Sequence, residues 1–291
     1  MIKIIFQELR YYQWLKNLLV FSALFFSGNI FNIKYIIITI FGFIVFCLLS
    51  SCVYIINDII DIEKDKLHPQ KKLRPIASGK LKIIEAIFLL AFLFSLILVF
   101  LTYLKNFYFT ITALIYFFMM VAYSLYFKNI IIADVIVIAL GFILRAISGA
   151  ELIKVEISNW LVICTFLLAL FLALGKRRSE IINLGEIAIN FKKILSDYNI
   201  QIIDYFLTIV GSTIIFSYIL YAFDERTVSK LSYNMRFSIP FVVYGILRYF
   251  FLIQQNKYTE TPEIIIIKDK PTLINLCLWV LSILFILYFK N

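Results

Sequence analysis

Long apolar runs alternate with short polar segments along the whole chain. Nine runs can be marked, at approximately residues 15–33, 35–56, 85–104, 107–127, 130–150, 158–175, 203–223, 236–254 and 272–289. Most of them approach the ~20 residues that a helix needs to cross a bilayer. Strands are not expected, because an open sheet edge inside lipid would leave backbone groups without hydrogen-bond partners. The pattern therefore predicts an all-α polytopic membrane protein with about nine transmembrane helices.

The composition supports the same class of protein. Hydrophobic residues make up 63% of the 291-residue chain, charged residues make up 16%, and the mean hydropathy is +0.95. A soluble domain is roughly half apolar and a quarter charged, so these values argue against a soluble helical protein. We find neither an internal repeat nor a polar linker that divides the sequence. Residues 1–291 are therefore predicted to form a single transmembrane domain.

The thiol and imidazole side chains do not indicate a metal centre. The four cysteines lie inside apolar runs without a zinc-like CxxC spacing, and all are expected to be buried packing residues: Cys47, Cys52, Cys164 and Cys277. A single histidine, His68, excludes a multi-histidine site. No small-residue cleavage site follows the first apolar run, so a removed signal peptide is not expected.

Lysine and arginine are unevenly distributed between the loops. If the N-terminus is inside, the inner regions hold 19 of them, the outer regions hold 7, and Arg145 and Arg248 lie within apolar runs. The positive-inside rule therefore predicts a cytoplasmic N-terminus and an outer C-terminus. The two longest polar loops, 58–84 and 176–202, then face the cytosol. The net charge of +10 fits anionic lipids or substrates, and no nucleic-acid-binding module is visible.

The first of these loops begins with acids. Residues 57–79 read NDIIDIEKDKLHPQKKLRPIASG, in which Asn57, Asp58, Asp61 and Asp65 would share one face of a continuing helix. Clustered carboxylates need a cation, and hard oxygen ligands suit Mg²⁺, which shares its coordination shell with substrate phosphates. We expect these four residues to bind magnesium and the three aspartates to act in catalysis. A solvated acidic helix end balanced by lysines is the alternative.

Bases follow the acids in the same loop. Lys71, Lys72 and Arg74 are expected to bind phosphate groups, because lysine offers a point charge and arginine a bidentate fork. Acids that hold a metal followed by cations that hold phosphate form a diphosphate-binding pattern. His68 either acts in catalysis or holds the loop by hydrogen bonds, and both roles stay open.

Charges also lie near the fifth apolar run. Tyr123, Lys128 and Asp134 surround the short inner turn before it, and Arg145 lies inside it. An ionisable group inside a membrane span is costly and is a functional hypothesis by default. The structural alternative for Arg145 is an ion pair with an acid on a neighbouring helix.

A third polar cluster, LGKRRSE, ends the sixth apolar run at residues 174–180. Lys176, Arg177 and Glu180 are candidates to contact phosphate. An ordinary positive-inside anchor is the alternative, and the motif by itself is weak. Three polar clusters at one membrane face are a stronger indication of a site.

At these residues the sequence resembles the UbiA-type intramembrane prenyltransferase superfamily, whose first aspartate-rich motif is NDxxDxxxD followed by a basic loop. The closer resemblance is to its polyprenyl-phosphate phosphoribosyltransferase branch, over almost the whole chain. The similar stretches are QWLKNLLVF (13–21), FCLLSSCVYIINDIIDIEKDKLHPQKKLRPIASG (46–79), GFILRAISGA (141–150), LGKRRSE (174–180), PFVVYGILRY (240–249) and PEIIIIKD (262–269). Asp134 is followed by VIVIALGF rather than by a partner acid, so the second DxxxD-like motif of prenyl-diphosphate enzymes is missing. This departure favours the phosphoribosyl branch and weakens any second-metal role.

The resemblance implies a UbiA-like domain over residues 1–291 that transfers a 5-phosphoribosyl group from 5-phosphoribosyl 1-diphosphate to a polyprenyl phosphate, with Mg²⁺ as cofactor and diphosphate as product. It implies a bacterial inner membrane protein that contacts membrane lipids, with its active site on the cytoplasmic side, in cell-wall biogenesis. The implied substrate-binding residues are Lys16, Asn17, Lys71, Lys72, Arg74, Tyr123, Lys128, Asp134, Arg145, Lys176, Arg177 and Glu180. The polyprenyl length, the number of metal ions and a homo-oligomeric state are left open.

Two other functions remain as alternatives. An orthodox prenyltransferase would move a prenyl group from its diphosphate to an aromatic or other acceptor, and a second acidic motif would favour it. An ion-coupled transporter would place acids or broken helices near the middle of the membrane. The acids of this chain gather instead at the cytoplasmic ends of the predicted helices.

Overall fold

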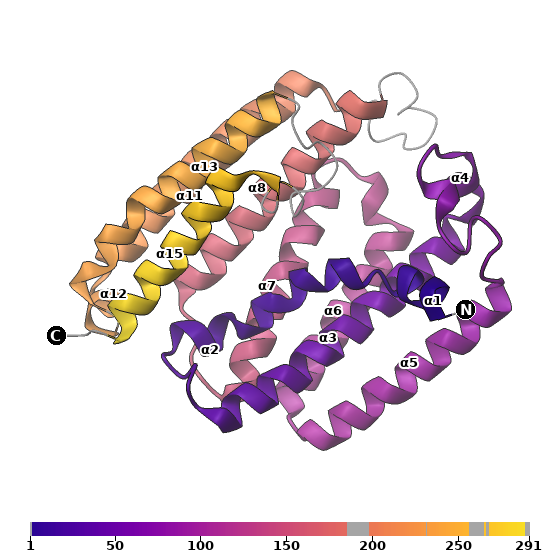
Figure 1. Ribbon diagram of the computed structural model, residues 1–291, viewed down its shortest axis with the longest axis horizontal. Helices are drawn as coiled ribbons and strands as arrows, with labels where there is room; N and C mark the ends of the chain where they lie inside the picture. The colour runs from indigo at the N-terminus through magenta and orange to yellow at the C-terminus, as the bar shows by residue number, and fades with distance from the viewer. Residues whose placement is uncertain (1, 185–197, 231, 256–264, 266–267, 289–291) are drawn as a thin grey trace. The chain divides into compact units, whose positions relative to one another are not determined.

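The computed structural model describes residues 2–184, 198–230, 232–255, 265 and 268–288. Within those ranges every regular element is a helix, so the expected all-α class is confirmed (Figure 1). Eight helices in this part of the chain are long and apolar enough to cross a membrane. They are α3 (Ile33–Ile60), α5 (Ile83–Leu104), α6 (Phe107–Leu125), α7 (Ala133–Ile153), α8 (Asn159–Leu184), α11 (Ile200–Phe223), α13 (Ile239–Gln254) with the preceding η5 (Tyr233–Ser238), and α15 (Lys270–Tyr288). The protein is therefore an integral membrane protein.

The first apolar run forms two shorter helices instead of one long helix. η1 (Tyr11–Phe21) is a 3-10 helix that continues directly into α2 (Ser22–Phe26). A 3-10 helix rises about 2.0 Å per residue and an α-helix about 1.5 Å, so the two elements end to end reach about 30 Å. Because that length matches the hydrocarbon core of a bilayer, η1 and α2 together provide the ninth apolar segment.

The 3-10 winding of η1 decides which of its side chains are buried. At about three residues per turn, Trp14, Asn17 and Val20 fall in one row, and Asn17 and Val20 are completely buried. α7 packs against this row so closely that a Cβ at Gly149 would lie 1.9 Å from the carbonyl oxygen of Val20. A glycine is therefore required at position 149.

Residues 1–157 form the first of two compact units. Its core is built on the aromatic rings of Phe46, Phe109 and Tyr116, each at most 1% exposed. The ring centroid of Phe46 lies 6.0 Å from that of Phe109 and 5.1 Å from that of Tyr116, so α3 and α6 are joined by aromatic packing. α5 packs on α3 with few buried residues and exposes large side chains such as Phe88. These exposed apolar side chains suit contact with lipid.

Residues 158–291 form the second unit, built from α8, α11, α13 and α15. α11 packs along α8, and α13 packs on α11 and α15. The rings of Phe171 and Tyr249 join α8 to α13 with their centroids 5.2 Å apart. The structure describes each unit by itself, so a single domain over the whole chain stays a prediction.

The cysteines only partly meet the expectation of burial. Cys47 and Cys52 are buried in α3, and Cys164 in α8 is half-buried. Cys277 is exposed, so the prediction was wrong for this residue. The reason is that α15 buries few of its side chains, and an apolar run alone does not distinguish a core-facing position from a lipid-facing one.

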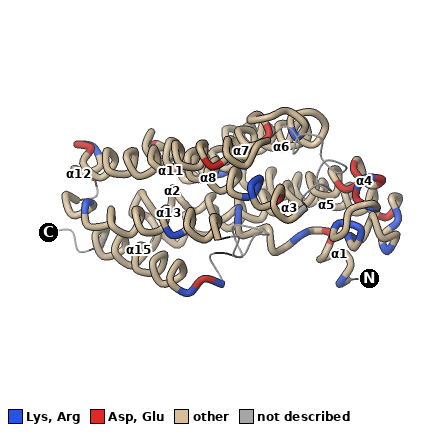
Figure 2. The backbone as a smooth tube through the Cα atoms, turned by 90° about the horizontal axis from the view of Figure 1, so that it is seen from above, with Lys and Arg blue, Asp and Glu red and all other residues tan. Residues whose placement is uncertain are grey.

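Short helices gather at the polar end of the first unit. They are α1 (Ile2–Leu9), α4 (Ile62–Leu67), η2 (Lys71–Leu73) and η3 (Phe127–Asn129). Figure 2 shows charged residues crowded around α1 and α4, whereas the long helices of this unit are mostly uncharged. In the second unit a further short helix, α12 (Glu225–Lys230), follows α11. The charges around α1 and α4 come from segments far apart in the sequence, and their pairing defines the candidate site.

Candidate active site

The three aspartates of the acid-rich stretch are separated by a break in the helix. α3 ends at Ile60, Asp61 adopts φ −96° and ψ 12°, and α4 then begins. Asp58 and Asp65 are 2% and 3% exposed, whereas Asp61 is half-buried at the joint. Because the helix breaks at Asp61, the side chain of Asp61 meets a different cation from the one that Asp58 and Asp65 have in common.

Asp58 and Asp65 are held by two arginines. Arg10, which follows α1, donates from Nη2 to both carboxylate oxygens of Asp58, at 2.5 and 2.6 Å. Arg74 donates from Nη1 to Asp58 at 3.0 Å and also to Asp65. Charge-assisted hydrogen bonds of this kind are about twice as strong as neutral ones. The two buried acids thus share the guanidinium of Arg74, and Asp58 has Arg10 as a second partner.

Asp61 and Asn57 meet a different cation. Lys128 of η3 donates to Asp61 at 2.6 Å and to Asn57 at 3.3 Å. Lys128 is 8% exposed, so its ammonium group is largely removed from solvent. The sequence prediction placed Lys128 in a separate polar cluster at the same membrane face, and the structure brings it into contact with Asn57 and Asp61 of the aspartate-rich motif.

These pairs bear on the predicted metal site. Among the residues that the structure describes, no group of three or more His, Cys, Asp and Glu side chains lies close enough to hold a metal ion. The donor chemistry nevertheless fits Mg²⁺, because every candidate ligand is a carboxylate or amide oxygen. The metal-binding and catalytic roles of Asn57, Asp58, Asp61 and Asp65 therefore stay predictions.

The base-rich loop after α4 closes over the acids. Arg74 reaches them directly, and Lys71 lies near enough to Asp65 to lower the pKa of that carboxyl. Burial has the larger effect, so the pKa of Asp65 is raised above its ordinary value. Lys72 is exposed. Of the three predicted phosphate-binding residues, two are therefore beside the carboxylates and one faces solvent.

His68 is engaged in the backbone of the same loop. Its Nδ1 atom accepts hydrogen bonds from the backbone N–H groups of Gln70 at 3.2 Å and Lys71 at 3.3 Å. His68 also ends α4 with an extended backbone. These contacts support the role of holding the loop, which the sequence left open beside a catalytic role.

Arg145 lies deep inside the first unit and has neutral partners. Its Nε donates to Asn17 at 2.7 Å, Nη1 donates to the carbonyl of Gly141 at 2.8 Å, and Nη2 donates to the hydroxyl of Tyr116 at 2.8 Å. Its guanidinium also lies 4.6 Å from the Tyr116 ring centroid, a cation–π contact. The alternative of an ion pair with an acid was therefore wrong for the described part of the chain. Neutral dipoles hold the charge but do not cancel it.

The other predicted residues of the first unit are placed around this core. Asn17 also donates to Ser50 at 3.3 Å, which fixes it between α3 and Arg145. Lys16 and Tyr123 are half-buried, and Asp134 in the first turn of α7 is completely buried. Their contact with substrate stays a prediction.

The LGKRRSE motif lies in the second unit, where its arginines have structural partners. Arg177 pairs with Glu180 at 2.5 Å, one turn further along α8. Arg178 binds Asp204 at 2.7 Å and the carbonyl of Ile253 at 2.9 Å, which ties α8 to α11 and α13. Lys176 is half-buried. A contact between this cluster and the carboxylates of the first unit stays a prediction. Residues 185–197 of the predicted polar loop 176–202 lie outside the described residues.

Two charged residues of the site were not assigned from the sequence. Arg10 was counted only as an inside charge, although it is the bidentate partner of Asp58. Glu8 is 1% exposed, and neither carboxylate oxygen has a hydrogen-bond partner among the described residues. Burial, and then the charge of Asp58, raise the pKa of Glu8 to about 7. Packing of α1 on α3 brings both residues to the site, and no local motif marks that contact.

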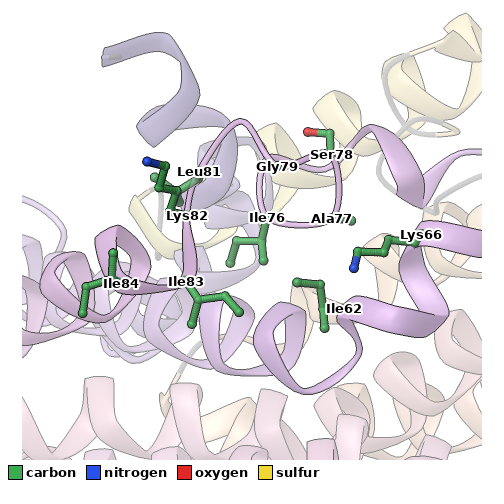
Figure 3. Close-up of a pocket in the computed structure, with 10 residues that line it drawn as sticks. All are labelled: Ile62, Lys66, Ile76, Ala77, Ser78, Gly79, Leu81, Lys82, Ile83 and Ile84. Atoms are coloured by element: carbon green, nitrogen blue, oxygen red, sulfur yellow. The ribbon is translucent and has the colours of Figure 1, made fainter.

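A pocket of about 600 Å³ lies between α4, the following loop and the start of α5 (Figure 3). Its lining is mostly apolar, with two lysines: Ile62, Lys66, Ile76, Ala77, Ser78, Gly79, Leu81, Lys82, Ile83 and Ile84. No aspartate lines it. The candidate catalytic aspartates are therefore not part of this pocket.

Comparison with known proteins places the chain in a family. Decaprenyl-phosphate phosphoribosyltransferase of Mycolicibacterium smegmatis is 30% identical over 96% of this chain and 90% of that protein. The protein of the same name from Corynebacterium glutamicum is 29% identical over 97% of this chain and 86% of that protein. The solved structure of a UbiA homologue from Archaeoglobus fulgidus, bound to GPP and Mg²⁺, has a TM-score of 0.71 and 19% identity over 98% of this chain and 99% of its own. The sequence profile of the UbiA prenyltransferase family matches residues 18–178, and the chain belongs to that family.

Proposed function

We propose that the protein transfers the 5-phosphoribosyl group of 5-phosphoribosyl 1-diphosphate to a polyprenyl phosphate and releases diphosphate. The observation that carries the proposal is the cluster in which Arg10, Arg74 and Lys128 are held by three aspartates at the polar end of a membrane unit. Such a cluster offers both metal ligands and phosphate-binding cations. Near-full-length similarity to two decaprenyl-phosphate phosphoribosyltransferases supports the choice of donor and acceptor.

Magnesium is the cofactor that suits this cluster. Asp58, Asp61 and Asp65, with Asn57, would hold the ion, and it would neutralise the charge that develops on the departing diphosphate. A carboxylate that binds a metal no longer needs its present cation. The donors of Arg10, Arg74 and Lys128 would then serve phosphate oxygens, for which a planar guanidinium offers bidentate contacts.

The reaction needs no strong base from the protein. The bond from ribose C1 to the diphosphate oxygen breaks, and a bond forms from C1 to an oxygen of the lipid phosphate. A phosphate monoester is largely dianionic at neutral pH, so it attacks without giving up a proton to the protein. The engagement of His68 with the loop backbone fits this requirement. Catalysis then depends on the positioning of both substrates and on electrostatic stabilisation.

Arg145 would act on the acceptor side. Its positive charge lies inside a membrane-spanning helix and is not cancelled by an acid among the described residues. An anionic lipid headgroup that reaches the polar end of the unit would be attracted by this charge. The positive-inside distribution favours the cytoplasmic side of a bacterial inner membrane for this chemistry, in polyprenyl-phosphoribose synthesis for the cell wall.

A second candidate is prenyl transfer from a prenyl diphosphate. It is favoured by the similarity in fold to an archaeal homologue bound to GPP and Mg²⁺. The missing partner acid after Asp134 makes it the weaker candidate. Ion-coupled transport is weaker still, because the acids of the first unit lie near the ends of its long helices or outside them, as Asp58 does in α3 and as Asp134 and Glu151 do in α7.

The experiment is a diphosphate-release assay with purified protein in detergent and Mg²⁺. One reaction supplies 5-phosphoribosyl 1-diphosphate with a long polyprenyl phosphate, and the other supplies a prenyl diphosphate with an aromatic acceptor. We expect release only in the first reaction, with a phosphoribosyl lipid detected by mass spectrometry. Release only in the second would overturn the proposal.

Variants test the role of the cluster in the same assay. Asp58→Asn keeps the side-chain shape and is expected to lower the rate by about 10²–10³. The matched control is Glu63→Gln, because the Glu63 side chain is 78% exposed and pairs with Lys66 at the surface. Equal rates for the two variants would show that the carboxylate cluster is not the active site.

A further inference from the structure

Glu8 differs from every other acid of the charged cluster. Asp58, Asp61 and Asp65 each have a cation at hydrogen-bond distance. Glu8 is as deeply buried as they are, yet both of its carboxylate oxygens lack a hydrogen-bond partner within the described ranges. Buried polar groups are nearly always satisfied, because an unmet acceptor loses its hydration without compensation.

Glu8 lies within the electrostatic reach of the candidate site. It is in the last turn of α1, two residues before Arg10, and α1 packs on α3. The charges of Asp58, Arg10, Arg74 and Asp65 all act on its carboxyl. The unmet acceptors therefore belong to the region where the phosphoribosyl donor is proposed to bind.

The chemistry of a carboxylate restricts what completes it. In its charged form Glu8 would repel phosphate oxygens, because they are acceptors that also carry negative charge. Neutral hydroxyl groups are suitable, because each carboxylate oxygen can accept one hydroxyl in a short charge-assisted hydrogen bond. Acidic side chains recognise ribose hydroxyls in this way in dinucleotide-binding folds.

We infer that Glu8 is a substrate-binding residue that accepts hydrogen bonds from the 2- and 3-hydroxyls of the donor ribose. The inference rests on the proposed function, and it adds the feature that selects the donor. A prenyl diphosphate has no hydroxyl group and would leave Glu8 buried without a partner. Sites built to bind a hydroxyl reject the analogue that lacks it by about 10⁴–10⁵.

The test compares two stable competitors, ribose 5-phosphate and 2-deoxyribose 5-phosphate, as inhibitors of the phosphoribosyl transfer reaction. Wild-type protein should bind ribose 5-phosphate about 10- to 100-fold more tightly, since it alone offers the 2-hydroxyl. Glu8→Gln and Glu8→Ala should reduce this preference to within about threefold. Glu63→Gln is the control and should retain the wild-type preference.

Two further measurements separate this role from others. The inhibition constant of inorganic diphosphate, which has no ribose, and the Mg²⁺ concentration for half-maximal rate should both stay within about threefold in Glu8→Gln. A preserved preference between the two sugars in both Glu8 variants would overturn the inference. A shifted Mg²⁺ requirement with unchanged sugar preference would also overturn it and would assign Glu8 to the metal.

Failure of the proposed function would look different. In that case wild-type protein would not transfer a phosphoribosyl group at all, and the wild-type assay alone would reveal the failure. If wild-type protein is active, but wild-type protein and the Glu8 variants show the same preference for ribose 5-phosphate over 2-deoxyribose 5-phosphate, only the inference about Glu8 is overturned.

Discussion

Arg10 and Asp58 are 48 residues apart in the sequence, yet one nitrogen of Arg10 contacts both carboxylate oxygens of Asp58. The contact joins the short helix α1 to the end of α3, the helix that carries the aspartate-rich motif. Burial alone would lower the pKa of Arg10, but the Asp58 carboxylate reverses this effect and the pKa is raised. Arg10 is therefore charged at neutral pH, and its contact makes the segment around α1 part of the candidate site.

Two replacements of Arg10 should distinguish the contribution of its positive charge from that of its planar guanidinium shape. Arg10→Lys keeps a cation but loses the planar fork, and we expect kcat/KM for the phosphoribosyl donor to fall about 10- to 100-fold. Arg10→Ala should in addition destabilise the protein by about 3–5 kcal/mol, because it breaks a buried pair. Steady-state kinetics and thermal unfolding in detergent measure the two effects. Arg226→Lys on the exposed surface of α12 is the control, and equal kinetics in the two lysine variants would contradict the prediction.

Lys128 and Asp61 should behave as an energetically coupled pair. Each is buried or half-buried, so removing one leaves the other charge without its partner. We expect Lys128→Met and Asp61→Asn each to lower the unfolding temperature, and the double variant to lose less than the sum. The coupling energy should be about 1–3 kcal/mol. Strict additivity in thermal unfolding would mean that the two charges do not interact.

Gly149 should not tolerate even one added carbon. Gly149→Ala places a Cβ 1.9 Å from the Val20 carbonyl oxygen, so η1 and α7 must move apart. We expect a loss of at least about 1–3 kcal/mol in the free energy of unfolding. Gly245→Ala is the matched control, because its Cβ would meet only the amide end of Asn275 at 3.3 Å. Alanine also favours a helix over glycine, so the control should lose much less stability than Gly149→Ala. Equal thermal stability of both variants would contradict the close approach.

Asp269 should make the stability of the second unit dependent on pH under acidic conditions. The hydrogen bonds from Arg248, and those from Thr272, lower the pKa of Asp269 from 3.8 to about 2. A carboxyl whose pKa is lower in the folded state stabilises the fold above its unfolded pKa. That contribution is lost as the pH falls from about 4 towards 2. The unfolding temperature of wild-type protein should decline over this range, and Asp269→Asn should flatten the decline. An identical pH profile for the variant would show that other groups cause it.

The sequence was sufficient for the fold class and for the membrane segments, because long apolar runs leave few structural choices. It also located the acids, the bases and Lys128, whose residue types and spacing indicate their chemistry. It failed for the partner of Arg145. An arginine in a membrane span suggests an acid nearby, whereas Asn17, Gly141 and Tyr116 provide neutral oxygens. Such partners are too common in helices to be recognised from spacing.

Arg10 and Glu8 show a second limit. Both lie before the first apolar run, where a charged residue is normally taken to indicate the orientation of the first membrane segment. Their position at the candidate site depends on tertiary packing between α1 and α3, and no local period encodes that contact. The break after Ile60 is similar, because nothing in NDIIDIEKD interrupts the helical pattern. Residues joined by long-range packing are therefore the ones that were missed.

The winding of η1 has a consequence for how this segment can change in evolution. Its buried row contacts two helices: Trp14 donates to Ser51 of α3, whereas Asn17 accepts from Arg145 and Val20 faces Gly149, both of α7. The next row, with Leu15 and Leu18 about half exposed, should accept many apolar replacements. Insertion of a single residue would instead turn the rest of the helix by about 120°. All later contacts would then be lost together, so homologous chains should vary in residue identity here while keeping the length of the segment fixed.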